Sequence, residues 1–137
     1  MERWEIQQRI NTLESRRAEL EEKISKLEGR KERLELEQAA KLRDIENVSD
    51  LYSERRTTSE LLYEGLEGVA ATKAAGKLGE IYSIGNQEAL VSKMEDIIYY
   101  LKKCCEKADA DIEDARLEIS NIDCQLYDDR KALEEME

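Results

Sequence analysis

The side chains of this chain that could do chemistry are mainly carboxylates. Its 137 residues include 33 Asp and Glu, six Tyr and three Cys, but no His. Without His, the commonest general acid or base is missing, and the carboxylates fall on helix faces that we expect to be solvated. The glycine pairs Gly65/Gly68 and Gly76/Gly79 match neither GxxxxGK[ST] nor GxGxxG, and neither pair follows a predicted strand. We therefore expect no enzyme active site and no cofactor.

The cysteines are Cys104, Cys105 and Cys124, and all three fall within one predicted helix. Two are adjacent and the third lies about five helical turns further along, so no intrachain disulfide can close without breaking the helix. Since there is no His and no CxxC, we expect no zinc site or other metal site. Reduced thiols in the cytoplasm are the simplest interpretation.

The elements that carry these groups are two amphipathic helices. Apolar residues recur every three or four positions in the second half of the chain, at positions a and d of a heptad whose letters run from a to g. A weaker seam runs from Ile6 to Tyr52, and no Pro interrupts either run. Thirteen of the fourteen positions of the second seam are apolar: Val91, Met94, Ile98, Leu101, Cys105, Ala108, Ile112, Ala115, Ile119, Ile122, Leu126, Asp129, Leu133 and Met136.

Two such seams predict an all-α fold, a long antiparallel helical hairpin forming a single domain. We expect a long helix over 1–55, a connecting helical cap over 56–85 and a second long helix over 86–137. Thr57-Thr-Ser-Glu60 has the form of a capping box, which predicts a new helix start. Gly85-Asn86 predicts a helix break followed by an N-cap. Pairing between two chains in a coiled-coil dimer is the alternative to a hairpin within one chain.

One charged pair is expected to set the register of the two seams. When Leu20 is placed opposite Leu126, Asp129 faces Arg17. An uncompensated buried charge costs on the order of several kcal/mol. We therefore expect the Arg17–Asp129 pair to disfavour a slip of one heptad.

The back face of the second helix carries apolar residues that a two-helix hairpin does not need. Leu117 and Cys124 fall at f positions, opposite the seam, and Tyr127 and Tyr99 fall at b positions beside them. These residues predict a second stripe for a partner helix, although a few apolar residues on a back face also arise by chance. Trp4 falls outside the first seam and is either an anchor for a partner or an ordinary end residue.

The net charge of −11 is unevenly distributed. Residues 1–60 carry 13 basic and 15 acidic side chains, whereas residues 61–137 carry 9 and 18. Because acidic surfaces repel phosphate, we expect neither nucleic acid nor membranes as partners. A basic partner would suit the second half, and solvated charge that serves solubility is the alternative. Without a signal-peptide pattern or a long apolar run, we expect a cytoplasmic protein, or one secreted with its partner without a cleaved signal peptide.

Tyr63-Glu64-Gly65 lies between the helical stretches, where an aromatic residue followed by glycine marks a tight helix junction or is an ordinary aromatic beside a flexible residue. In layout the chain resembles the YwqH-like proteins, which are related to the ESAT-6-like or WxG superfamily. Those proteins have a charged N-terminal coiled coil, a short variable middle and a second amphipathic helix. Residues 90–101 and 108–122 resemble that family most. The resemblance implies a targeting factor that binds the helical N-terminal domain of an LXG toxin for type VII secretion, together with a second small helical protein.

The chain departs from that family at its motifs. Tyr63 stands where W-x-G has tryptophan. The family's export motif is Tyr or Phe, three residues, then an acid, but the tail match that begins at Tyr127 ends in Lys131. Tyr63 and Glu67 have the spacing of this export motif, but they lie in the middle segment of the chain. We therefore expect the chain to rely on a partner for its export signal.

Three functions follow from these patterns. The first is a non-enzymatic helical adaptor, and the second is a prefoldin-like chaperone subunit, which needs β-strands between its helices. The third is a structural coiled coil that assembles with itself, and a homodimer is open in each case. The Ala/Gly-rich middle segment has few β-branched residues, which argues against strands.

Overall fold

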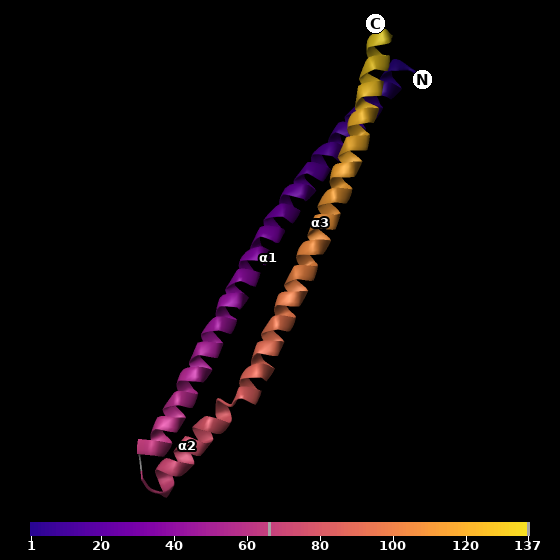
Figure 1. Cartoon of the computed structure of the whole chain (residues 1–137). Helices are drawn as coiled ribbons and strands as arrows, with labels where there is room; N and C mark the ends of the chain where they lie inside the picture. Colours follow the sequence, from indigo (N-terminus) through magenta and orange to yellow (C-terminus); the bar gives the residue numbers. More distant parts are fainter. Residues whose placement is uncertain (66, 137) are drawn as a thin grey trace. The chain divides into compact units, whose positions relative to one another are not determined.

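The two long seams form two long helices, joined through a short one. The computed structural model describes residues 1–65 and 67–136. It contains α1 (Arg3–Gly65), α2 (Val69–Ile81) and α3 (Ile84–Glu135), as Figure 1 shows. The described residues contain no strand, so the expected all-α fold is confirmed.

The first helix is longer than expected, because α1 continues into the first ten residues of the expected cap and ends at Gly65. The hydroxyl groups of Thr57 and Thr58 donate to the carbonyl oxygens of Ser53 and Glu54 at 3.1 and 3.0 Å. Hydroxyls that bond four residues back within a helix do not cap a new one. The predicted helix start at Thr57 and the predicted end of the first helix at residue 55 are therefore wrong.

The break before the third helix also differs from the prediction at Gly85-Asn86. α3 begins at Ile84, and the backbone N–H of Asn86 donates to Ser83 Oγ at 3.2 Å. The Asn86 side chain points the other way: its Nδ2 donates to the carbonyl oxygens of Glu80 and Ile81 at 2.9 and 3.1 Å. Ser83 therefore caps the start of α3, and Asn86 satisfies the end of α2.

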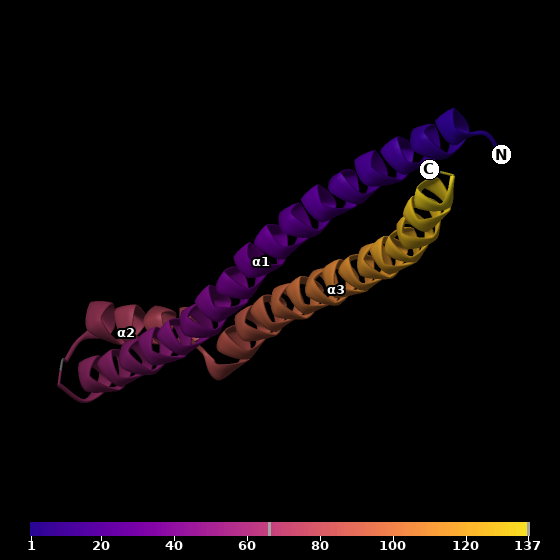
Figure 2. The ribbon, with the colours of Figure 1, turned by 90° about the horizontal axis from the view of Figure 1, so that it is seen from above.

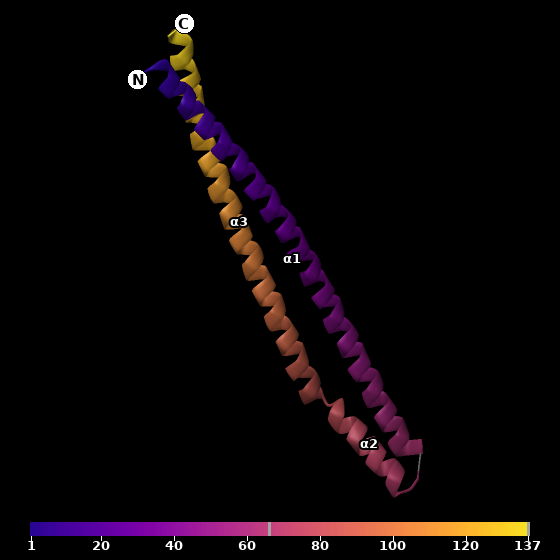
Figure 3. The same ribbon diagram turned by 180° about the vertical axis from the view of Figure 1, so that it is seen from behind.

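The chain divides into two units, each with segments of both long helices. Unit 1 consists of Met1–Leu34 with Lys103–Glu137, and unit 2 consists of Glu35–Lys102. In unit 1, the first turns of α1 lie beside the last turns of α3 (Figure 2). In unit 2, α2 lies beside the last turns of α1 (Figure 3).

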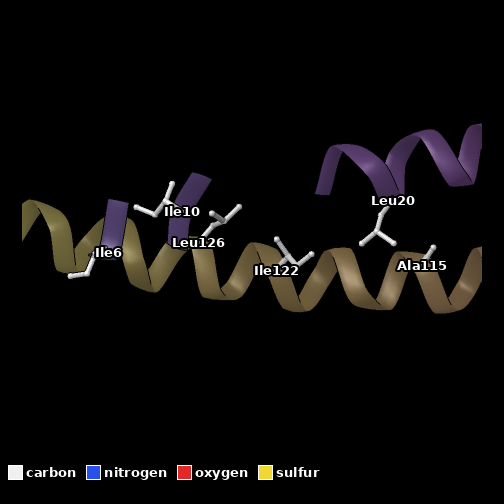
Figure 4. Close-up of a cluster of buried hydrophobic side chains, with 6 residues drawn as sticks. All are labelled: Ile6, Ile10, Leu20, Ala115, Ile122 and Leu126. Atoms are coloured by element: carbon white, nitrogen blue, oxygen red, sulfur yellow. The ribbon is translucent and has the colours of Figure 1, made fainter. Parts of the chain in front are cut away.

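The core of unit 1 is formed by seam residues. In α3, each of the fourteen seam positions is buried or half-buried except Met136, which is 47% exposed. The same is true of every expected seam position from Ile6 to Tyr52 in α1. The heptad pattern therefore predicted the buried faces correctly. The buried members of the cluster are those in Figure 4: Ile6, Ile10, Leu20, Ala115, Ile122 and Leu126.

The expected Arg17–Asp129 pair is not formed. Asp129, 4% exposed, accepts hydrogen bonds from Arg9, whose Nε lies 2.7 Å from Oδ2 and whose Nη2 contacts Oδ1. Arg17 instead donates from Nε to Oδ1 of Asp123 at 2.7 Å and from Nη1 to Glu21. The register prediction failed because it assumed that the partner of Asp129 occupies an a position of the first seam, where Arg17 lies. Arg9, at a g position, reaches Asp129 from the flank of the seam.

A ladder of opposite charges runs along one flank of unit 1. Four α3 residues at seven-residue intervals alternate in sign, and each pairs with an α1 residue of opposite sign. The paired numbers rise along α1 as they fall along α3. The ladder pairs are Arg130–Glu14 at 2.7 Å, Asp123–Arg17 at 2.7 Å, Arg116–Glu28 at 3.0 Å and Asp109–Lys31 at 2.7 Å.

Unit 2 packs α2 on α1 through small residues. Ser59 of α1 donates from Oγ to the carbonyl oxygen of Ala75, which is fully buried, at 2.8 Å. A Cβ at Gly79 would lie 3.2 Å from Ser59 Oγ, so the absence of a side chain there permits the close approach. Beside this contact, the rings of Tyr52 and Tyr82 meet edge to face, with centroids 5.0 Å apart.

Candidate partner-binding surface

The candidate surface lies on the back face of α3 in unit 1. Because the seam positions of α3 pack inward, the f positions between them must point away from the core. Leu117 is 64% exposed and Tyr127 is 67% exposed, and Cys124 is exposed with a free thiol. Leu117 and Cys124 are seven residues apart, about 10 Å along the helix. These three residues, hereafter the α3 stripe, form a row of exposed apolar side chains that take no part in the core of unit 1.

The stripe lies in an acidic surrounding. Between residues 110 and 128 the only basic side chain of α3 is Arg116, which is held by Glu28 at 3.0 Å and Glu113 at 3.5 Å. Asp114 and Asp128 are exposed, and neither has an ion pair among the residues that the structure describes. The stripe therefore presents apolar side chains beside carboxylates whose charge is not compensated.

The two other expected partner contacts, Tyr99 and Trp4, lie on other segments of the helices. Tyr99 lies in unit 2, is 57% exposed and meets Tyr100 edge to face with centroids 6.0 Å apart. Trp4 lies on α1 and is 60% exposed, and its Nε1 donates to Glu2 at 2.9 Å. Both side chains are exposed, as a partner contact requires.

The predicted junction residues lie at the end of α1. Tyr63 is 62% exposed in the last turn, and Gly65 is the final residue of the helix. Sequence reasoning missed Gly68, whose φ of 110° lies in the left-handed region and which caps the start of α2. Glycine just before a helical run was the available signal.

A second surface that sequence reasoning missed lies on α1 of unit 1. It is a hollow lined by side chains of α1, hereafter the α1 hollow. Four of its side chains are basic and two are acidic. The lining residues are Glu19, Glu22, Lys23, Ser25, Lys26, Leu27, Gly29, Arg30 and Arg33. The signal was present in the sequence as four basic residues and a glycine within about three turns of helix.

Two chemical possibilities find no support in the part of the chain that the structure describes. No group of three or more His, Cys, Asp and Glu residues is placed to hold a metal ion. Among the described helices, none combines the length and the apolar character that a membrane span requires.

Comparison with known proteins does not assign the chain to a family. No family model, no curated protein and no solved structure matches it.

Proposed function

We propose that this chain is a non-enzymatic adaptor that binds a helical protein partner along the α3 stripe. The observation that carries the proposal is the exposure of Leu117 and Tyr127 on a helix whose own core positions are already filled. A helix that buries one face within its unit and presents a second apolar row can accept the apolar face of another helix. Tyrosine is enriched among the anchors of protein interfaces, and helices that dock on one another bury apolar side chains such as leucine.

The scaffold that supports this surface is, in our proposal, an antiparallel helical hairpin closed within one chain. The ladder pairs support it, because residue numbers rise on α1 as they fall on α3. A slip of one heptad would place Arg17 opposite Arg130 or Arg116, so like charges would replace opposite ones. The ladder thus favours the observed register, and with it a fixed position for the stripe.

We propose, more narrowly, that the partner is the helical N-terminal domain of an LXG-type toxin. The adaptor would help to present this domain to the type VII secretion machinery. This narrower proposal rests on the resemblance to YwqH-like proteins. Tyr63 is exposed and Gly65 ends α1, so the residues that stand in place of W-x-G lie at a helix end, although tyrosine replaces the tryptophan of the family's motif.

The test is coexpression of this chain with such a domain and measurement of the complex by light scattering. Leu117→Asp/Tyr127→Asp should abolish the complex while the circular dichroism spectrum stays helical. Leu36→Asp/Tyr100→Asp is a matched control, since those residues are 65% and 68% exposed in unit 2. Loss of the complex in both double variants, or in neither, would contradict binding through the stripe.

The two other candidate functions are supported less well. A prefoldin-like subunit needs strands between its helices, and residues 1–65 and 67–136 contain none. A structural coiled coil would assemble with itself and form no complex with the toxin domain in the same experiment.

A further inference from the structure

Gly29 is a glycine that the fold of this chain does not require. It lies in the middle of α1, where glycine weakens a helix relative to alanine. A Cβ built at Gly29 would meet only the guanidinium Nη1 of Arg33, at 3.7 Å, which is an ordinary contact with a flexible side chain. Packing within the chain therefore gives no reason for a glycine here, whereas close approach by a side chain from outside would give one.

The α1 hollow around Gly29 has a basic rim. Lys23, Arg30 and Arg33 are exposed, and among the described residues none of the three takes part in an ion pair. Lys26 is held by Glu22 at 3.1 Å. Half-buried Leu27 adds an apolar surface beside Gly29. The hollow thus suits an apolar side chain that projects from an acidic helix.

We propose that the occupant of the α1 hollow is the α3 stripe of a second copy of this chain. The stripe has what the hollow lacks: exposed Leu117 and Tyr127 as projecting side chains, and Asp114 and Asp128 as uncompensated carboxylates. Among the described residues, Lys23, Arg30 and Arg33 at the rim of the hollow have no acidic partner, and Asp114 and Asp128 have no basic one. Complementary charge on two faces of one chain favours association between copies.

This contact joins two different surfaces, so two copies that meet through one such contact are arranged head-to-tail. Each copy that joins leaves one hollow and one stripe free, so association continues beyond two copies unless the assembly closes into a ring. The inference goes beyond the proposed function, since it concerns the free protein. It also predicts competition, because the partner of the adaptor and the second copy would use the same stripe.

The first test is sedimentation velocity of the full chain over a range of concentrations in low salt. The weight-average mass should rise with concentration above that of one copy, and added salt should lower it. Gly29→Gln fills the hollow with a residue that favours helix, and should lower the association constant by about tenfold or more. Gly29→Ala adds a Cβ that makes only an ordinary contact with Arg33 in its own chain, so it should leave the helix intact and weaken association less than Gly29→Gln does.

A charge exchange decides which surfaces meet. Asp114→Lys/Asp128→Lys should be monomeric, and so should Arg30→Glu/Arg33→Glu, because each places like charges across the contact. An equimolar mixture of the two double variants should associate again, since each variant supplies the charge that the other lacks. Helicity measured by circular dichroism controls for folding in each case.

Three results would overturn the inference: a wild-type monomer at every concentration, association that Gly29→Gln leaves unchanged, or a mixture of the charge variants that stays monomeric. None of these touches the proposed function, which is decided by complex formation with the toxin domain. Conversely, a chain that assembles as predicted and ignores that domain would keep this inference and refute the adaptor.

Discussion

Arg9 and Asp129 are 120 residues apart in sequence, and the guanidinium of the first holds the buried carboxylate of the second through two hydrogen bonds. Asp129 lies within the α3 seam, between Leu126 and Leu133 of the apolar cluster. Its side chain is 6% exposed, whereas that of Arg9 is 49% exposed. The hydrogen bond from Arg9 lowers the pKa of Asp129 although burial acts to raise it. The pair thus keeps a charged group stable at the edge of a hydrophobic core.

Removing Arg9 should cost more stability than removing a comparable surface arginine. Arg9→Met leaves the Asp129 carboxylate buried without a partner, whereas Arg16→Met removes an exposed pair with Glu118. Asp129→Leu continues the apolar seam. It should either raise the free energy of unfolding or lower it by no more than about 1 kcal/mol. Urea titrations followed by circular dichroism measure all three. Equal losses for Arg9→Met and Arg16→Met would contradict this account of the pair.

The Arg9–Asp129 pair should also affect how the free energy of unfolding falls at acid pH. The pKa of Asp129 is lowered in the folded chain, so its contribution is complete above the ordinary carboxyl pKa of about 4 and is lost as the pH falls through the lower folded value. The wild type should therefore lose stability below about pH 4 more steeply than Asp129→Leu does. Urea midpoints between neutral pH and about pH 2 test this, and parallel profiles for the two proteins would refute it.

The ladder pairs should behave as coupled charges. Glu14 and Arg130 are 49% and 56% exposed and pair at 2.7 Å. Glu14→Arg and Arg130→Glu should each lower the free energy of unfolding by about 0.3–1 kcal/mol, and the double exchange should recover most of the loss. A double-mutant cycle repeated at high salt measures the coupling, which should shrink with screening. Single losses that simply add in the double variant would show that the pair does not interact.

Two glycines of α2 give a matched pair of predictions. Nothing lies within 4 Å of a Cβ at Gly76, whereas one at Gly79 would crowd Ser59 Oγ at 3.2 Å. Gly76→Ala should therefore stabilise α2 by about 0.5–1 kcal/mol through helix propensity. Gly79→Ala should gain less or lose stability, because it displaces the hydroxyl that binds Ala75. Amide hydrogen exchange of α2 reports the difference, and equal protection in the two variants would argue against close α1–α2 packing.

The sequence predicted the buried faces well, because heptad spacing depends only on local periodicity. Every expected seam position from Ile6 to Leu133 is buried or half-buried, although that row includes Arg17, Lys31 and Asp129. Helix ends were less predictable. Thr57 and Asn86 have the residue types of caps, but whether their side chains cap or bond back along a helix depends on packing between α1, α2 and α3.

Pairing across the helices was the least predictable feature. Aligning the seams could identify Asp129 as a seam residue that needs a cation, but it could not choose between Arg17 at an a position and Arg9 on the flank. A long arginine side chain reaches across more than one turn, so the choice depends on side-chain conformations that heptad letters do not encode. The α3 stripe, in contrast, was predictable, because Leu117 and Cys124 lie opposite a seam that the periodicity defines.

The most direct test of the adaptor is the affinity of the purified chain for the N-terminal domain of an LXG-type toxin, measured by isothermal titration calorimetry. The wild type and Leu36→Asp/Tyr100→Asp should each form a one-to-one complex. The affinity of Leu117→Asp/Tyr127→Asp should be at least about a hundredfold weaker, since each buried anchor contributes about 1–2 kcal/mol or more. Wild-type binding that the stripe variant retains in full, or no binding by the wild type, would contradict the central claim.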